Sequence, residues 1–201
     1  MSVTDTSAAP GLRDITREAV RTRIAEVAIA RFDAEGFENV TVEQIAAEVG
    51  ISARSFHRYF PAKEDAVIGD VARHRDAVAA AFRDQPADVP VWTALRGAFA
   101  EMVRRGADDP ETARRSVRVM TSTASLRARN LEKHLSWAEA LTPLVTERVG
   151  GTVRDPELHA HTLVQAALGC FDVAIATWST GDDPDALAIL LRTFDVLQQA
   201  D

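Results

Sequence analysis

Apolar residues recur at every third or fourth position along most of the chain, which is the spacing of one face of an α-helix. In the first such segment, over residues 16–34, Val20, Ile24, Val27 and Phe32 form one apolar stripe. No segment shows a convincing alternation of apolar and polar residues at the two-residue period of a β-strand. The pattern therefore predicts an all-α protein.

Glycine and proline residues separate the periodic segments and place the ends of the expected helices. The pattern predicts about nine helices, over residues 16–34, 41–49, 53–59, 63–84, 91–105, 110–123, 126–148, 155–180 and 184–199. We interpret residues 13–62 as an N-terminal three-helix domain and residues 63–201 as a C-terminal helical bundle.

Several helix ends carry recognisable capping residues. Thr41 followed by Gln44 predicts a capping box, and Gly50 followed by Ser52 predicts a tight turn that stops one helix and caps the next. Three later helices are expected to start at an acidic residue followed by proline, at Asp109-Pro110, Asp155-Pro156 and Asp183-Pro184.

Composition narrows the class of protein without naming a function. The chain has 201 residues, 46% hydrophobic and 26% charged, which is typical of a soluble globular protein of one or two domains. Its single cysteine, Cys170, cannot form an intrachain disulfide, and the N-terminus has no signal-peptide pattern, so we expect a cytoplasmic protein. The net charge of −7 argues against non-specific coating of nucleic acid.

The longest apolar run, over residues 163–178, is interrupted by Gln165 and Asp172. It falls short of the roughly 20 residues that span a bilayer, so we expect a helix buried on most of its faces and no membrane association.

Residues 41–60 have the layout of a helix-turn-helix, with two short helices joined by a turn that contains glycine. Ile45, Ala46 and Val49 would hold the first helix against the core, and Phe56 and Phe60 would anchor the second. The second helix then keeps a polar face that is able to lie in the major groove of DNA.

Charge is distributed unevenly around this motif. The stretch from Ile51 to Lys63 contains Arg54, Arg58 and Lys63 and no acidic residue, although residues 1–70 as a whole are net acidic. Arg13, Arg17 and Arg21 fit either a solvated helix face or an arm that contacts the DNA backbone. The local pattern predicts a small basic strip on an acidic protein.

About 35 residues of this region together resemble the DNA-binding domain of TetR-family transcriptional regulators. The resemblance rests on Phe-x-x-Glu-Gly-Phe over residues 32–37, on Thr-Val-x-x-Ile-Ala-x-x-Val-Gly-Ile-Ser over 41–52, and on Phe-His-Arg-Tyr-Phe-Pro-Ala-Lys-Glu-Asp over 56–65. The bundle that follows resembles, more weakly, family members with an acyl-CoA-type ligand, including mycofactocin-regulator-like proteins.

The resemblance implies a DNA-binding role for each matching residue. Arg54 and Ser55 would reach base edges, and the phosphate contacts would come from Thr41, Ser52, His57, Tyr59 and Lys63. Family members often carry Tyr where His57 stands and His where Tyr59 stands, so a base preference inferred from Tyr does not transfer.

The family resemblance also implies a homodimer formed through the last two helices, bound to a two-fold symmetric operator in double-stranded DNA. Leu187, Leu190, Leu191, Phe194 and Leu197 supply an apolar stripe for that interface, unless the two helices only close the core of a monomer.

A lipophilic effector, acyl-CoA-like or otherwise, would bind among the large apolar side chains of the middle helices. The candidate ligand-binding residues are Trp92, Phe99, Met102, Met120, Trp137, Leu141, Phe171 and Asp172. Each apolar one is also explained by plain core packing. Asp172 is a candidate ligand or interface contact and is equally explained by a cap-like or interhelical salt bridge. The basic residues Arg114, Arg115, Arg118, Arg127, Arg129 and Lys133 form either a solvated face or a receptor for an anionic effector.

Enzyme motifs are missing from the sequence. It has no Gly-x-Gly pair, phosphate-binding loop or Gly-x-Ser-x-Gly elbow, and Cys170 lies in an apolar helix where it is expected to be inert. His159 and His161, two residues apart on a helix, face different sides, so we expect no metal and no cofactor. The prediction is a ligand-responsive repressor, and the alternative is a small-molecule-binding bundle without DNA affinity.

Overall fold

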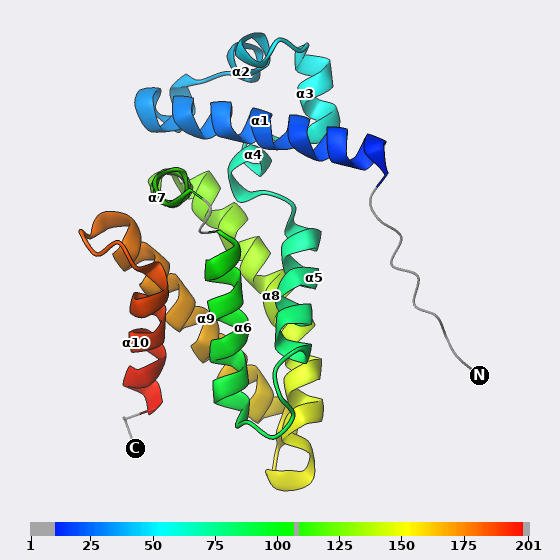
Figure 1. Cartoon of the computed structure of the whole chain (residues 1–201), viewed down its shortest axis with the longest axis vertical. Helices are drawn as coiled ribbons and strands as arrows, with labels where there is room; N and C mark the ends of the chain where they lie inside the picture. Colours follow the sequence, from blue (N-terminus) through cyan, green and yellow to red (C-terminus); the bar gives the residue numbers. More distant parts are fainter. Residues whose placement is uncertain (1–10, 107–108, 199–201) are drawn as a thin grey trace. The chain divides into compact units, whose positions relative to one another are not determined.

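A computed structural model of the chain describes residues 11–106 and 109–198, and no strand occurs within these two ranges. The helices are α1 (Leu12–Glu35), η1 (Phe37–Asn39), α2 (Val42–Val49), α3 (Ala53–Tyr59), α4 (Asp65–Ile68), α5 (Val71–Arg83), α6 (Val91–Arg105), α7 (Pro110–Ser122), α8 (Ala124–Val149), η2 (Gly150–Thr152), α9 (Pro156–Thr180) and α10 (Ala186–Gln198) (Figure 1). The predicted all-α class is confirmed.

The chain divides into two compact units with the boundary between Ala66 and Val67. In the N-terminal unit, α1 packs against α2 and η1, and α2 packs against α3. Ile24 of α1, Ile45 of α2 and Phe56 of α3 are completely buried where these helices meet. Burying side chains of this size contributes about 1.5–3 kcal/mol each, which fixes the short helices on the long one.

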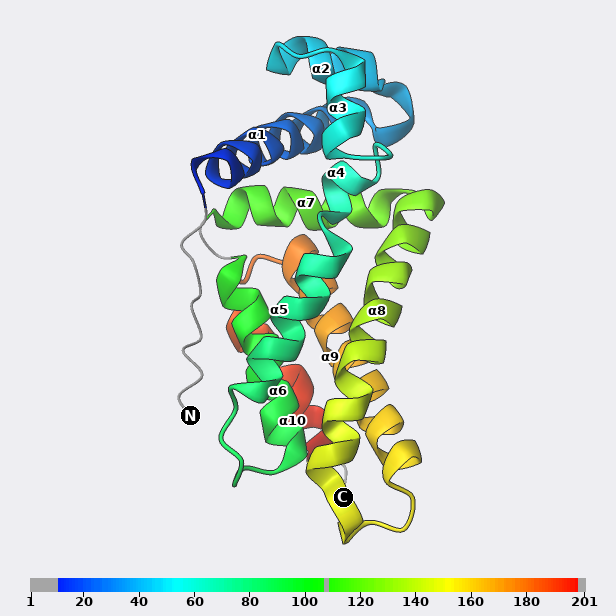
Figure 2. The same cartoon turned by 90° about the vertical axis from the view of Figure 1, so that its right-hand side faces the viewer.

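The C-terminal unit is a bundle of α5, α6, α8, α9 and α10, with α7 crossing one end of it (Figure 2). Helix α9 packs against α6, α7, α8 and α10, and α8 also packs against α5. Phe99, Leu141, Val164 and Phe194 are completely buried between these helices. The core of the unit is therefore built around α8 and α9.

The predicted caps of the helix-turn-helix are confirmed. Thr41 and Gln44 form a reciprocal capping box, with the Gln44 amide donating to Thr41 Oγ1 and the Thr41 amide donating to Gln44 Oε1. Gly50 adopts the left-handed conformation (φ 80°, ψ 30°), and Ser52 Oγ accepts from the Ser55 amide at 3.1 Å. These local bonds place α2 and α3 at the ends predicted for them.

The single helix expected over residues 63–84 is wrong, because it is broken into α4 and α5 at Gly69 and Asp70. Gly69 has φ +81°, and a Cβ built on it would lie 2.7 Å from Cε1 of His74. Asp70 caps α5 by accepting from the Arg73 amide. A glycine in this conformation and an aspartate cap together stop one helix and start another.

The last helix also starts later than the Asp183-Pro184 pair predicts. Asp185, not Asp183, accepts from the amide of Ala188 in the first turn, and Asp183 in turn accepts from the Asp185 amide. The paired aspartates form a turn before the helix, so α10 begins at Ala186.

Helix α9 is not buried on most of its faces, contrary to expectation. Gln165, Gly169, Asp172, Val173 and Ala176 lie along one exposed side. The burial expected of Asp172 is therefore wrong, because its side chain is 53% exposed on that side.

By length and apolar composition alone, α9 is also the one helix of the described residues that could cross a membrane. Its opposite side packs on four helices of the bundle, which is what a core helix does.

Candidate nucleic-acid interface and effector core

Two phenylalanines set the orientation of α3 in the helix-turn-helix. Phe56 and Phe60 are buried with their rings 5.7 Å apart, as the sequence predicts. Phe56 lies on the inner face of the seven-residue helix α3, and Phe60 directly follows the helix. Arg54, His57 and Arg58 are left exposed on the other faces. Arg54 lies in the first turn, where a recognition helix presents side chains to base edges.

Two of the hydroxyl groups predicted to contact phosphates, those of Thr41 and Ser52, already act as helix caps. Thr41 Oγ1 accepts from the Gln44 amide, and Ser52 Oγ both accepts from the Ser55 amide and donates to Ser55 Oγ at 3.0 Å. Both threonine and serine are exposed. A bound phosphate would therefore meet helix N-termini that are ordered beforehand.

His57 is held in one tautomer by the backbone. Its Nδ1 lies 3.2 Å from the carbonyl oxygen of Pro61, and only a protonated Nδ1 can donate to a carbonyl. The exposed ring then presents an unprotonated Nε2 when it is neutral. A phosphate contact from His57 consequently requires the imidazolium form.

Lys63 reaches back across the N-terminal unit. Its ammonium donates to the carbonyl oxygens of Phe37 at 2.8 Å and Val40 at 3.3 Å, and it lies 4.1 Å from the centre of the Phe37 ring. The three contacts tie the segment after α3 to the one before α2. They occupy two of the three ammonium protons and leave one for a phosphate.

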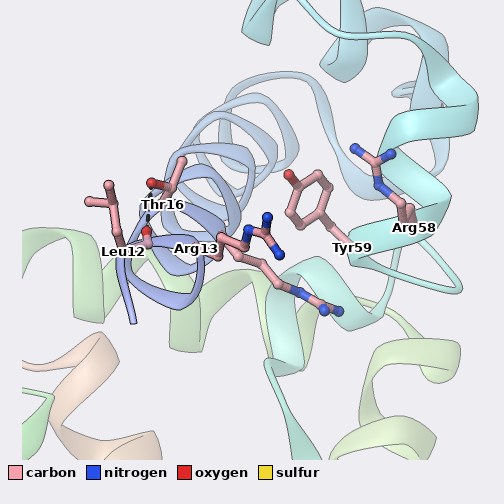
Figure 3. Close-up of a pocket in the computed structure, with 6 residues that line it drawn as sticks. Leu12, Arg13, Thr16, Arg58 and Tyr59 are labelled. Atoms are coloured by element: carbon pink, nitrogen blue, oxygen red, sulfur yellow. Dashed lines mark hydrogen bonds between the residues drawn. The ribbon is translucent and has the colours of Figure 1, made fainter. Parts of the chain in front are cut away.

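The N-terminal unit also contains a basic groove of about 600 Å³, lined by Leu12, Arg13, Thr16, Arg17, Arg58 and Tyr59. In the close-up of Figure 3, the Tyr59 ring lies between the side chains of α1 and Arg58. The Arg58 guanidinium lies 5.5 Å from the centre of that ring. Arg21 Nη1 holds the end of α3 by donating to the Tyr59 carbonyl at 3.2 Å.

In the C-terminal unit, most of the predicted ligand-binding residues belong to one apolar cluster. Phe99, Trp137 and Leu141 are part of the buried core, and Trp92, Met102 and Phe171 pack against it. The Phe171 ring lies 5.4 Å from Phe99 and 5.6 Å from Trp137. Met120 is partly buried on α7, and its sulfur lies 4.0 Å from Lys133 Nζ.

Asp172, on the exposed side of α9, lies against this cluster beside a histidine. Its Oδ2 is 3.3 Å from Nδ1 of the buried His134 on α8. Asp172 therefore makes an interhelical contact with a basic side chain.

The basic residues on α7 and α8 do not form one continuous surface. Arg114 donates to the carbonyl oxygens of Gly181 and Asp183 and lies over the Trp178 ring, which secures the turn after α9. Other contacts of this group join Arg118 to Glu111, Arg127 to the Thr121 carbonyl and Arg129 to Glu132. Lys133 is the one residue of this group that is buried, with 8% of its surface exposed. The prediction of a solvated basic face is therefore wrong at Lys133.

Two further cavities lie on the C-terminal unit. A groove of about 890 Å³ runs between α8 and α9 and includes Gln165, and a smaller one of about 460 Å³ includes Trp92 and Arg148. No cluster of three or more metal-binding side chains occurs in the part of the chain that the structure describes. Cys170 is buried, which raises the pKa of its thiol.

Both units match models of known protein families. Residues 24–67 match the model described as bacterial regulatory proteins of the tetR family, and residues 89–200 match the MftR C-terminal domain. The chain belongs to the TetR family. It is therefore a DNA-binding transcriptional regulator with a ligand-binding domain, as the sequence resemblance implies.

Individual relatives agree with this family assignment. A regulator assigned to mycofactocin biosynthesis in Mycobacterium tuberculosis is 29% identical, and the match covers 87% of this chain and 87% of the relative. The TcmR regulator of Streptomyces glaucescens is also 29% identical over 77% of this chain and 71% of its own length.

The fold is shared with FadR of Bacillus subtilis, solved in complex with stearoyl-CoA. The TM-score is 0.62 at 18% identity, and the match covers 89% of this chain and 98% of that one.

Sequence reasoning left the roles of Arg13, Arg17, Arg58 and Lys133 open in this TetR-family regulator and gave His134 none. Arg13, Arg17 and Arg58 share one groove with Tyr59, and Lys133 and His134 lie beside Trp137 in the core. The four-residue spacing of Arg13 and Arg17 was a usable signal for a common helix face. No sequence signal indicated that Lys133 is buried, because a lysine between Glu132 and His134 is expected to be exposed to solvent.

Proposed function

We propose that this TetR-family regulator is a repressor that binds a palindromic operator as a homodimer and leaves it when a small lipophilic effector binds the C-terminal unit. The observation that carries the DNA-binding part is α3, anchored by Phe56 and Phe60 with Arg54 exposed in its first turn. Arg54 and Ser55 would read base edges, with phosphate contacts from Thr41, Ser52, His57, Tyr59 and Lys63.

The basic groove adds a second phosphate-binding region to this proposal. Arg13, Arg17 and Arg58 would face the DNA backbone beside α3. Because the protein as a whole is acidic, affinity for bulk DNA would be modest, would depend on these few cations and would fall as salt rises.

Helices α9 and α10 would form the dimer interface. Leu190 and Phe194 of the stripe predicted for this interface are fully buried within the C-terminal unit. The interface would therefore use Leu158 and Val173 of α9 and Val196 and Leu197 of α10, which are about half exposed or more. Apolar side chains gathered on adjacent helices are typical of surfaces that bind a partner. A symmetric pair of such faces would place two copies of α3 on the two halves of one operator.

The effector would enter the cluster of Phe99, Trp137 and Phe171. A chain matching the MftR C-terminal model, with a fold found in a stearoyl-CoA complex, supports a hydrophobic or acyl-CoA-like effector here. Binding would change the spacing of the DNA-binding units and so lower operator affinity.

An electrophoretic mobility shift assay with DNA from next to the protein's own gene tests the DNA-binding part. Wild-type protein is expected to shift this DNA at low salt, and competition by unrelated DNA is expected to be weak. Failure to shift any fragment at low salt would overturn the proposal in favour of a small-molecule-binding bundle. Release of the shifted DNA by lauroyl-CoA would support the effector part.

A further inference from the structure

Polar nitrogens of three α8 residues, Lys133, His134 and Trp137, lie inside the apolar core of the C-terminal unit. The His134 side chain is 6% exposed and Trp137 is 2% exposed. Neither His134 Nε2 nor Trp137 Nε1 has a hydrogen-bond partner. Buried polar groups are nearly always paired, so two unpaired nitrogens one helical turn apart indicate a place that serves a ligand.

Lys133 lies on the same side of α8. Its ammonium contacts the sulfur of Met120 at 4.0 Å and lies 5.3 Å from the centre of the Trp137 ring, and neither group carries a negative charge. Burial lowers the pKa of Lys133 to about 8, and the nearby Asp172 carboxylate opposes this shift. A buried ammonium in these surroundings is stabilised by any anion that reaches it.

Asp172 orients the imidazole. Its Oδ2 lies 3.3 Å from His134 Nδ1, which keeps a proton on Nδ1 and leaves Nε2 on the other side of the ring. The His134 ring is 5.5 Å from Trp137 and 6.2 Å from Phe171. The polar nitrogens therefore border the aromatic cluster in which a hydrophobic body would lie.

We propose that Lys133, with Trp137 Nε1, binds the anionic oxygen group of an effector whose hydrophobic body lies among Phe99, Trp137 and Phe171. The oxygen group is a carboxylate or a phosphate, since both accept hydrogen bonds from an ammonium and an indole N–H. The inference rests on the proposed effector function and adds the charge and the headgroup contacts of the ligand.

Calorimetric titration of the full-length protein with dodecanoate, 1-dodecanol and lauroyl-CoA tests this proposal. The first two probes share one hydrophobic chain and differ in the anionic group, and the third carries phosphates instead of a carboxylate. The variants are Lys133→Met and Trp137→Phe, which keeps an aromatic side chain and removes the N–H. Arg127→Met, on an exposed residue of the same helix, is the matched control for loss of one positive charge.

We expect wild-type protein to bind dodecanoate at least tenfold more tightly than 1-dodecanol. Lys133→Met should abolish that preference, Trp137→Phe should reduce it, and Arg127→Met should leave it unchanged. If lauroyl-CoA binds in a Lys133-dependent way and dodecanoate does not bind, the anion is a phosphate and the proposal holds.

Two outcomes would overturn the headgroup site. One is binding of both anionic probes to Lys133→Met with wild-type affinity, and the other is no binding of any probe to wild-type protein. Thermal melting of each variant checks folding, and Lys133→Met is expected to melt no lower than wild type because it removes an unpaired buried charge. Operator shifts on the same samples separate a failure of this inference from a failure of the repressor proposal.

Discussion

Arg54 and Lys63 carry the same charge in the N-terminal unit but lie in different surroundings. Arg54 is exposed in the first turn of α3, whereas Lys63 is partly buried and bonded to two backbone carbonyls. The exposed guanidinium of Arg54 is available to a base edge. The ammonium of Lys63 is hydrogen-bonded to the backbone and so stabilises the N-terminal unit. Substitution of the two residues is therefore expected to affect different measurements.

Arg54→Ala should weaken operator binding by about 1–3 kcal/mol and relax discrimination at one base pair, because a bidentate contact to a base edge is lost. Fluorescence anisotropy with the operator and with single-base variants measures both effects. Unchanged affinity together with unchanged selectivity would remove Arg54 from base reading.

Lys63→Met should lower the free energy of unfolding by about 1–3 kcal/mol, since hydrogen bonds from a charged donor to two carbonyls are lost. It should also reduce the slope of log affinity against log salt by about 0.9 for each phosphate contact removed. Chemical denaturation and a salt series of operator binding check the two effects. Reduced stability with an unaltered salt slope would leave Lys63 with a purely structural role.

Lys133 should make stability depend on pH in the alkaline range. Its pKa falls from 10.5 to about 8 on folding, mainly through burial. Between these two values the unfolded chain still binds the proton and the folded chain does not, so the free energy of unfolding should rise with pH. Below pH 8, Lys133 is protonated in both the folded and the unfolded chain, so its contribution to the free energy of unfolding does not change with pH.

Denaturation curves of wild type and Lys133→Met, taken from pH 7 to 10.5, isolate this contribution, because the other titrating groups are common to both. The difference in free energy of unfolding between wild type and Lys133→Met should become smaller as pH rises. A constant difference would show that the Lys133 ammonium keeps its ordinary pKa in the fold.

At the scale of elements, helix ends that depend on adjacent residues were predictable. The Thr41–Gln44 capping box, the Gly50 turn and the Asp109 and Asp155 caps all form as expected. The break at Gly69 was not predicted, because the apolar stripe from Val67 to Phe82 is compatible with one continuous helix. Capping bonds span three residues, so sequence reveals them, whereas a periodic stripe does not show where a backbone turns.

Thr41→Ala should destabilise the N-terminal unit by about 0.5–2 kcal/mol, because α2 loses its side-chain cap. Thr41→Ser, which keeps the hydroxyl oxygen, is the matched control and should stay close to wild type. Circular dichroism followed through a urea titration measures both variants. Equal stability of Thr41→Ala and Thr41→Ser would contradict a capping role.

At the scale of the whole molecule, the proposed dimer depends on the exposed side of α9 and on α10. Val173 and Val196 are 58% and 66% exposed, and placing a carboxylate on each of two symmetric faces would bury unpaired charge in the interface. Val173→Glu with Val196→Glu should therefore give a monomer in sedimentation at micromolar concentration. The monomer should bind a palindromic operator no more tightly than a half-site.

Leu131→Glu is the matched control for this prediction. Leu131 is 59% exposed on α8, outside the two helices assigned to the interface. It should leave the protein dimeric. A dimer that persists in the double variant, or a monomer produced by the control, would place the interface elsewhere.

The sequence by itself determined the helical class, the helix-turn-helix, the anchoring phenylalanines and the family, because all of these depend on residues close to one another along the chain. The structure alone decided that Lys133 is buried, that Asp172 is half exposed and that Arg13 and Arg17 share a groove with Arg58. Burial and pairing of these side chains depend on helices distant in the sequence, such as α7 and α9 around α8. Periodicity assigns a residue to a helix face, and tertiary packing determines what that face meets.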